Sequence, residues 1–534
     1  MICSRRLYKG NSYEICLPLK YSGVTGVNIY TDGAVKIPVT PEISGDTLCF
    51  EIASEDLDVL ADGVLRYELI TDSEVSDSNS RFVVKTPDGY SAQTLDILLE
   101  EAYQSGYTAG FTDGYDSKIC KDEYSGLPLT FEIISGGTIN WRIGEPNVRT
   151  IEYSKDMGAT WSSITSTEEG VQIPVEAGDR VQFRGNNSSY EPYSQGGRFG
   201  GSTAIFNVYG NIMSLISAED FESLSGLTES YSFLGLFGGA TGLVSAKNLI
   251  LPAMVLTFDC YGLMFYGCKS LIETPELPAT TLATRCYENM FNNCISLTTA
   301  PELPATTLAE SCYSSMFFNA RRLTVAPTLP ATTLATGCYK GMFQFCYSLT
   351  EAPELPATTL VPSGYTNMFQ FCSGLTSAPE LPATTLASFC YESMFSGCTS
   401  LTEAPVLPVT NLSGANSCYR WMFAGCTSLT EAPELPATVL DVSCYTGMFA
   451  GCTSLTASPI LPAPAIANSS YNGMFRGCTN LSTITCLLTA GTSIYNWVRD
   501  VAATGTFYKN PSATNWTTGI NGIPNGWTVV DYTQ

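Results

Sequence analysis

The chain has 534 residues, 44% of them apolar and 14% charged, which is a globular composition with room for several domains. Its 50 acidic and 26 basic residues give a net charge of −24, so we expect no nucleic-acid partner, because a phosphate backbone would be repelled. The chain contains no run of 18 apolar residues, and we expect no membrane insertion. Its first residues lack the apolar stretch of a secretory signal, so we expect it to be made and to fold in a cytoplasm.

Residues 1–90 alternate apolar and polar side chains between turn signals, for example at Val27 and Ile29 and at Leu48 and Phe50. A period of two predicts half-buried strands, and we interpret this segment as a β-sandwich anchoring domain. Residues 91–123 are predicted to form a helical linker, with aromatic residues every four positions over 103–115 and glycines between them. That stripe suits either a partner helix, which would make a homo-oligomer, or the adjacent domain.

Residues 124–212 return to a period of two and predict a second all-β module, an Ig-like sandwich. Leu129 and Phe131 are expected to face Ile139 and Trp141 across a Ser-Gly-Gly turn. Within this module, Ser154–Trp161 has the S-x-D-x-G-x-T-W spacing of an Asp-box. In that motif the aspartate bonds turn amides and the glycine takes an unusual dihedral angle, so a single copy predicts a structural hairpin and not a catalytic site.

Residues 213–486 form an array of about ten copies. Met-Phe pairs begin at residues 264, 290, 316, 342, 368, 394, 422, 448 and 474, and a degenerate Leu-Phe copy begins at 236. The steps are 26 residues long except for two of 28. Residues 487–534 leave this pattern and are interpreted as a C-terminal cap.

Each copy is predicted to contain one apolar helical face and one short extended run. In the copy that begins at residue 282, Cys286, Met290 and Cys294 lie four apart with Phe291 beside Met290, and we expect these four residues to form a core ladder. The segment from Leu297 to Leu303 is expected to be extended, and its prolines should limit pairing. One helix and one short strand per copy predict an α/β solenoid of the leucine-rich-repeat type.

The recurring cysteines could be disulfide partners, metal ligands or small core groups. Residues eight apart on a helix are about 12 Å apart, which is too far for a disulfide, and helices of adjacent coils are about 8–10 Å apart. Structural zinc sites favour closely spaced pairs, often with histidine, and the chain has no histidine. Ala320, Gly364 and Ser470 replace cysteine in single copies, which favours a reduced, small core group. We expect no metal and no other cofactor.

The repeated phrase CYxxMFxGCTSLTxAPxLPATTL resembles the BspA-like leucine-rich repeats of bacterial surface proteins and of phage genomes. The segments TIEYSKDMGATWSSIT, VYGNIMSLIS and GIPNGWTV resemble the flanks of such arrays, so the likeness covers about residues 124–534. The family implies adhesion or recognition and supplies no catalytic motif. Residues 1–123 look like the anchoring region of a phage appendage.

Candidate contact residues are the aromatic and arginine side chains that interrupt small or polar variable positions, since such residues dominate interface hot spots. They are Tyr266, Arg285, Phe318, Arg321, Arg322, Phe345, Tyr347, Phe371, Arg420, Trp421 and Arg476. The alternative is that they only adjust packing between coils. Paired catalytic carboxylates are not evident and histidine is absent, so we expect no enzyme activity.

Three functions remain open. The first is a phage fibre protein of the virion, attached to other virion proteins through its N-terminal region and bound to a host-surface glycan or protein through its repeats. The second is an adhesin on a bacterial cell surface. The third is a purely architectural virion protein.

Overall fold

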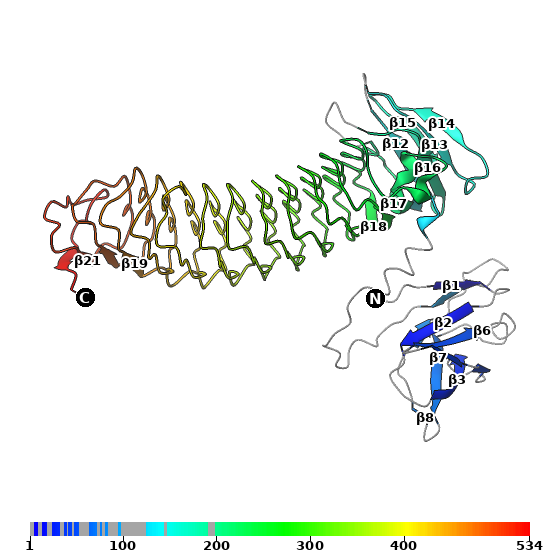
Figure 1. Ribbon diagram of the computed structural model, residues 1–534, viewed down its shortest axis with the longest axis horizontal. Helices are drawn as coiled ribbons and strands as arrows, with labels where there is room; N and C mark the ends of the chain where they lie inside the picture. Colours follow the sequence, from blue (N-terminus) through cyan, green and yellow to red (C-terminus); the bar gives the residue numbers. More distant parts are fainter. Residues whose placement is uncertain are drawn as a thin grey trace. The chain divides into compact units, whose positions relative to one another are not determined.

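The computed structural model describes residues 124–143, 147–190 and 198–533 in full, and within residues 1–123 it describes the backbone of the strands. The chain divides into two compact units, residues 1–122 and 123–534 (Figure 1). Within the predicted helical linker 91–123, Thr94–Ile97 forms a strand and not a helix. The rest of the linker, with the aromatic stripe at 103–115, lies outside the described residues, so the helix there stays a prediction.

The N-terminal unit contains three antiparallel sheets, in the orders β1-β10, β2-β6-β5 and β4-β3-β7-β8, with β9 also paired to β7. The predicted alternation at Val27 and Ile29 falls on a strand, and both residues pair with the strand that carries Ile37 and Val39. The strands are β1 Arg5–Tyr8, β2 Tyr13–Pro18, β3 Val24–Thr31, β4 Ile37–Val39, β5 Pro41–Ser44, β6 Thr47–Ile52, β7 Val64–Thr71, β8 Val75–Ser76, β9 Arg81–Val83 and β10 Thr94–Ile97.

The second unit begins with a β-module made of a six-stranded sheet, ordered β14-β13-β16-β11-β17-β18, and a two-stranded sheet, β12-β15. Phe131 lies at the centre of its core, with ring contacts to Phe183, Phe199 and Phe206. The elements are β11 Leu129–Ser135, β12 Gly137–Trp141, β13 Thr150–Ser154, β14 Ser162–Thr165, β15 Val171–Val175, β16 Arg180–Gly185, β17 Ile205–Asn211, the 3-10 helices η1 Ile212–Leu215 and η2 Phe221–Ser223, and β18 Leu243–Ile250.

The predicted pairing of the first two strands of this module is wrong. β11 pairs with β16 and β17, whereas β12 pairs with β15 in the other sheet. Leu129, Phe131, Ile139 and Trp141 are all fully buried, so the apolar alternation was interpreted correctly. The Ser-Gly-Gly segment connects two sheets instead of two neighbouring strands of one sheet.

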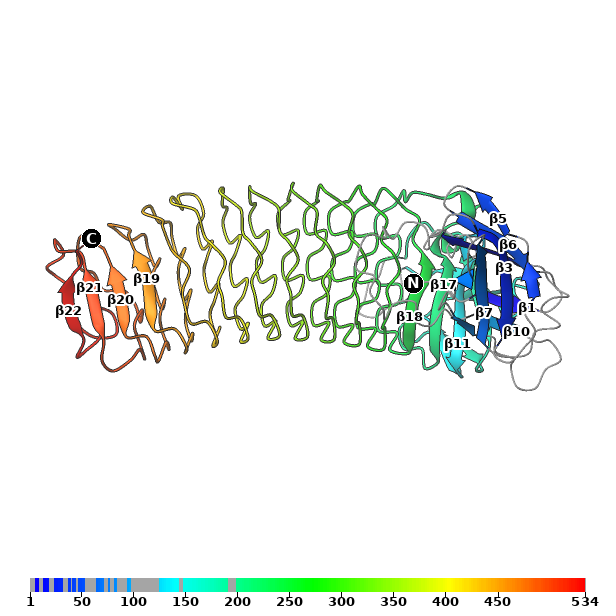
Figure 2. The ribbon, with the colours of Figure 1, turned by 90° about the horizontal axis from the view of Figure 1, so that it is seen from below.

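The repeats stack on this module. β18 runs parallel to β17, and the copies that follow continue the stack to the C-terminal cap (Figures 1 and 2). Phe237 of the degenerate copy stacks on Phe265 of the next, with ring centroids 5.3 Å apart. The same contact recurs in every later copy, so each coil is packed against its two neighbours.

The predicted helical face of the repeats is wrong, because this segment is a continuous series of tight turns. Arg285, Asn289 and Asn293 have φ values of 60°, 56° and 62°, a left-handed conformation that an α-helix does not contain. The amides of Glu288 and Met290 each donate to the carbonyl three residues earlier. The described part of the array contains no α-helix, so the α/β assignment is replaced by a mostly β and turn structure.

Every second amide of this segment donates to the next coil instead of to its own. Tyr287 donates to the carbonyl of Cys312 at 3.0 Å, and Phe291 donates to that of Met316 at 2.9 Å. A strict four-residue repeat also keeps side chains in line, whereas an α-helix of 3.6 residues per turn would drift by roughly 40° every four residues. The turn series therefore gives the cysteine, methionine and aromatic columns that stack straight along the array.

The core of the stack consists of these columns. Cys286, Met290, Phe291 and Cys294 are each completely buried, as the predicted ladder requires. The tyrosine column stacks nearly parallel, with Tyr287 and Tyr313 at 5.9 Å and an angle of 2°. Because each ring packs against the coil before and after it, the coils stabilise one another.

The 16 cysteines of the fully described residues are all free and buried, in agreement with a reduced core. The second cysteine of a coil also has a role that its size does not predict. The Cys294 Sγ donates to the carbonyl of Phe265 in the preceding coil at 3.1 Å, and the same bond recurs along the array. The other donors are Cys268, Cys346, Cys372, Cys398, Cys426, Cys452 and Cys478.

The opposite side of each coil is extended but barely paired, as the prolines predict. Thr299 and Val325 form a single parallel bridge, and Thr307 and Thr333 form another. Continuous parallel pairing returns only at the C-terminal end, where four strands lie side by side (Figure 2). These are β19 Ala457–Leu461, β20 Thr483–Cys486, β21 Thr506–Lys509 and β22 Thr528–Asp531.

The residues after the last repeat close the hydrophobic core. Trp497 is completely buried, contacts Phe475 of the last coil at 6.2 Å and stacks on Trp516. The Trp497 indole donates to the carbonyl of Gly522. Among the described residues, no helix has the length and apolar character needed to cross a membrane.

Candidate functional site

The turn corner of each coil, two to six residues after the methionine, carries the most distinctive surface of the array. Three coils, those with Met394, Met422 and Met448, have small residues and glycine there followed by Thr-Ser. The coils from Met290 to Met368 instead carry amides, aromatic rings and arginines at the same positions. We call this set the corner patch: Asn292, Asn293, Phe318, Asn319, Arg321, Arg322, Gln344, Phe345, Tyr347, Gln370 and Phe371.

Two aromatic residues of the corner patch occupy a backbone conformation that suits glycine. The third residue after the methionine has positive φ in each coil, and it is usually glycine or asparagine. Phe345 and Phe371 stand at this position with φ values of 65° and 62°. A bulky residue held there costs of order 1–3 kcal/mol. Leu263, Phe389 and Trp421 also have positive φ at other turn positions of the array, but Phe345 and Phe371 occupy the same position of two adjacent coils. Such outliers concentrate at functional sites, which makes this corner a candidate site.

The aromatic rings of the corner patch form one cluster over three coils. Phe345 stacks on Phe371 with centroids 4.9 Å apart and an interplanar angle of 9°. Phe318 meets Phe345 edge-on at 5.2 Å, and Tyr347 meets it at 6.2 Å. Phe371 and Tyr347 remain 40% exposed. A β-carbon on Gly397 would lie 2.3 Å from the Phe371 ring, so glycine in the next coil leaves the space that this ring fills.

Amides and arginines border the aromatic cluster. Asn319 Nδ2 donates to Asn293 Oδ1 at 2.6 Å, and Gln344 Nε2 donates to Gln370 Oε1 at 2.5 Å. Arg321 Nε donates to Asn319 Oδ1 at 2.8 Å, and its guanidinium lies 5.7 Å from the centre of the Tyr347 ring. Arg321 and Arg322 are exposed. The corner patch therefore combines cationic, hydrogen-bonding and aromatic groups.

The structure brings together six of the predicted contact residues in this patch: Phe318, Arg321, Arg322, Phe345, Tyr347 and Phe371. The amides Asn292, Asn293, Asn319, Gln344 and Gln370 belong to it and were missed from the sequence. Their signal was the replacement of small residues at two positions of the repeat, the second and third after the methionine, over adjacent coils.

The other predicted contact residues lie elsewhere on the array. Tyr266 is 43% exposed on an earlier coil, and Arg285 pairs with Glu288 at 2.7 Å. Arg420 lies 3.5 Å from Glu392. The remaining two are Trp421 and Arg476. Trp421 is half-buried and fills the space that a β-carbon on Gly447 would need, so it fits the alternative that these residues only adjust packing between coils. Arg476 is exposed near the C-terminal end.

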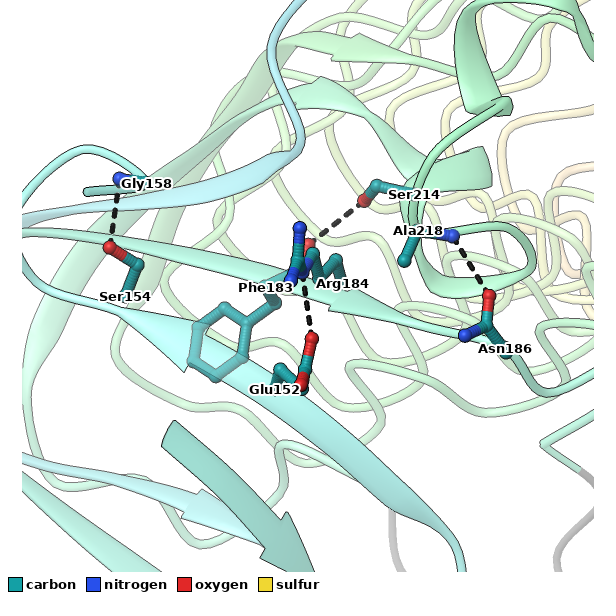
Figure 3. A network of polar contacts seen from close by, with 8 residues as sticks. All are labelled: Glu152, Ser154, Gly158, Phe183, Arg184, Asn186, Ser214 and Ala218. Atoms are coloured by element: carbon teal, nitrogen blue, oxygen red, sulfur yellow. Dashed lines mark hydrogen bonds and ion pairs between the residues drawn. The ribbon is translucent and has the colours of Figure 1, made fainter. Parts of the chain in front are cut away.

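The Asp-box-like segment forms the predicted hairpin between β13 and β14. The Gly158 amide donates to Ser154 Oγ at 2.8 Å (Figure 3), and Gly158 has a φ of 89°. Asp156 accepts hydrogen bonds from the amide and the hydroxyl of Thr160. Those bonds, with the Thr160 hydroxyl first, lower the pKa of the Asp156 carboxyl to about 2. This carboxylate fixes the turn.

Polar contacts beside the hairpin are also structural. Glu152 pairs with Arg184 at 2.7 Å (Figure 3). The Arg184 guanidinium also lies 4.1 Å from the centre of the Trp161 ring. Asn186 accepts a hydrogen bond from the Ala218 amide. The carboxylate of Glu152 is thus occupied by an internal cation.

The fully described residues contain no cluster of three acidic, cysteine or histidine side chains that could hold a metal ion. Their thiols are poor nucleophiles, because burial raises the pKa of each one; for Cys390 the pKa rises to about 12.

The fold and the corner patch together define a repeat protein whose coils form one hydrophobic core and whose variable side chains gather on one corner. The family model described as the BspA type leucine rich repeat region (6 copies) matches residues 242–376, 329–455 and 365–497. Residues 242–497 are therefore BspA-type leucine-rich repeats. This family is consistent with surface adhesion or recognition. A comparison with curated proteins gives no match.

Proposed function

We propose that the chain is a non-enzymatic recognition protein whose repeats form a leucine-rich-repeat solenoid and present the corner patch to a host surface. The observation that carries the proposal is the pair Phe345 and Phe371. Both are strained by positive φ, and Phe371 is well exposed, although glycine or asparagine fits the same position in most other coils. A ligand that uses these rings accounts for their retention in an unfavourable conformation.

Within this proposal the protein is a fibre component of a phage virion. Residues 1–90 would attach to other virion proteins, and the repeats would reach a cell-surface glycan or protein. The sequence resemblance of the repeats and flanks supports this assignment. The alternative is an adhesin displayed on a bacterial cell surface, which the same repeat family also supports.

Antibodies against the full chain distinguish the two locations. Immunogold labelling of phage particles from a lysate is expected to decorate their appendages. Labelling confined to the surface of intact, uninfected bacteria would favour the adhesin, and virion labelling without any binding of the purified chain to cells would favour a purely architectural protein.

The absence of enzyme activity is part of the proposal. It is supported by the engagement of Glu152 with Arg184 and of Asp156 with Thr160, which leaves the Asp-box-like hairpin with a structural role. The full chain is expected to release no product from a panel of glycoside and ester substrates. Turnover that disappears in an Asp156→Asn variant would contradict this part of the proposal.

A further inference from the structure

A chain of side-chain hydrogen bonds fixes one arginine at the corner patch. Asn292 donates to Asn289, Asn293 donates to Asn292, and Asn319 donates to Asn293, at 2.7, 2.7 and 2.6 Å. The Nε of Arg321 completes the chain on Asn319. Each link uses one donor and one acceptor, so each amide retains a second N–H and a second lone pair.

The patch carries two cations, of which Arg321 is held in place. Arg321 lies over the Tyr347 ring and is followed directly by Arg322. Among the described residues, neither arginine has a carboxylate within ion-pair distance, although the protein carries a net charge of −24. A guanidinium that is already oriented loses less entropy when it binds a carboxylate, which its planar fork matches in geometry.

The other groups of the patch suit hydroxyls better than apolar side chains. Phe345 and Phe371 stack on each other, and Phe371 remains 40% exposed. The free amide positions offer both donors and acceptors, which is what a hydroxyl group needs. One amide or ring stands on each coil from Asn293 to Phe371, so an extended ligand laid along the array contacts every coil.

We propose that the corner patch binds an acidic polysaccharide. The arginine pair attracts a carboxylate at contact distance, whereas the repulsion from the net charge of −24 is screened beyond about 8 Å at physiological salt. A sugar carboxylate pairs with Arg321 and Arg322, the hydroxyls bond the amides, and sugar C–H groups pack on Tyr347 and Phe371. This proposal rests on the proposed recognition function and names its ligand class. An acidic peptide shares the charge but lacks a repeating set of hydroxyls, and it is the competing outcome of the test.

The test measures binding of the full chain to four carboxylated polysaccharides: polygalacturonate, alginate, hyaluronate and polysialic acid. Methyl-esterified polygalacturonate removes the charge from the same polymer, and poly-glutamate supplies the charge without the sugar. The variant is Arg321→Gln/Arg322→Gln. Its control is Lys269→Gln/Arg476→Gln, which removes the same charge from exposed corner positions on other coils.

We expect saturable binding to at least one of the four polymers, at least about tenfold weaker for the Arg321→Gln/Arg322→Gln variant and unchanged for the control. The esterified polymer and poly-glutamate should bind at least about tenfold more weakly. Binding to none of the four, equal binding of poly-glutamate, or equal loss in both variants overturns the proposal. If the chain still binds bacteria in that case, the recognition function stands and only the ligand class fails; absence of both kinds of binding contradicts both.

Discussion

Replacing Phe371 by asparagine should change the stability of the array very little. About three fifths of this side chain is covered, since it is 40% exposed, so roughly 120 Å² is buried for an aromatic ring of about 200 Å². That area corresponds to at most about 3 kcal/mol, and to about 2 kcal/mol for a realistic unfolded chain. Asparagine tolerates the φ of 62° and regains about 1–2 kcal/mol of strain. The net change in unfolding free energy is therefore expected to lie within about 1 kcal/mol.

Phe369 provides the comparison within the same coil. It is completely buried in the phenylalanine column, so Phe369→Ala should destabilise the array by about 3–5 kcal/mol. Urea unfolding followed by circular dichroism measures both variants. If Phe371→Asn loses more than about 2 kcal/mol, the ring is a structural element and its strain needs no ligand to explain it.

Three further predictions concern the core and the hairpin. Burial raises the pKa of the thiols, and that of Cys260 rises from 9.0 to about 12. The free energy of unfolding should therefore be constant below about pH 9 and fall as the pH rises, because the unfolded chain then releases thiol protons that the folded chain keeps. Above about pH 9, each such thiol lowers the free energy of unfolding by about 1.4 kcal/mol per pH unit. A circular dichroism signal unchanged at about pH 11 would contradict this prediction. Cys398→Ala should cost about 1–2 kcal/mol in urea unfolding, because it removes the bond to Phe369 and leaves a small void; wild-type stability would exclude a role for that bond. Because the pKa of Asp156 is lowered to about 2, its carboxylate stabilises the hairpin above about pH 4, and this stabilisation is lost towards pH 2. Asp156→Asn should remove this acid sensitivity, measured by NMR of the hairpin, and an unchanged acid profile would refute the prediction.

The inward-facing residues of the repeats could be predicted from the sequence, but their backbone could not. Residues four apart share a face on a helix and also in a series of turns, so Cys286, Met290 and Cys294 gave the correct core with the wrong element. The signal that separates the two structures is the residue between them. In most coils the positions of Asn289 and Asn293 hold glycine, asparagine or serine, which suits positive φ and disfavours a helix interior.

The candidate site was predicted in part for a similar reason. Phe371 and Arg321 stand out because they are large residues at small positions of the repeat. Asn319 was overlooked because asparagine is common at turns, and only the hydrogen bonds to Asn293 and Arg321 reveal its part in the patch. Trp421 was grouped with these residues because the sequence does not show that its ring packs over Gly447 of the next coil.

The most direct test of the account measures saturable binding of the labelled full chain to a panel of intact bacteria. Phe345→Asn/Phe371→Asn removes both strained rings, and Gly425→Asn/Gly451→Asn is the control, because it places the same residue at the same corner position two or more coils away. We expect wild type and control to bind the same cells, and the double phenylalanine variant, although folded, to bind at least about tenfold more weakly. Equal binding by all three proteins, or binding by none, would contradict the claim that the corner patch recognises a cell surface.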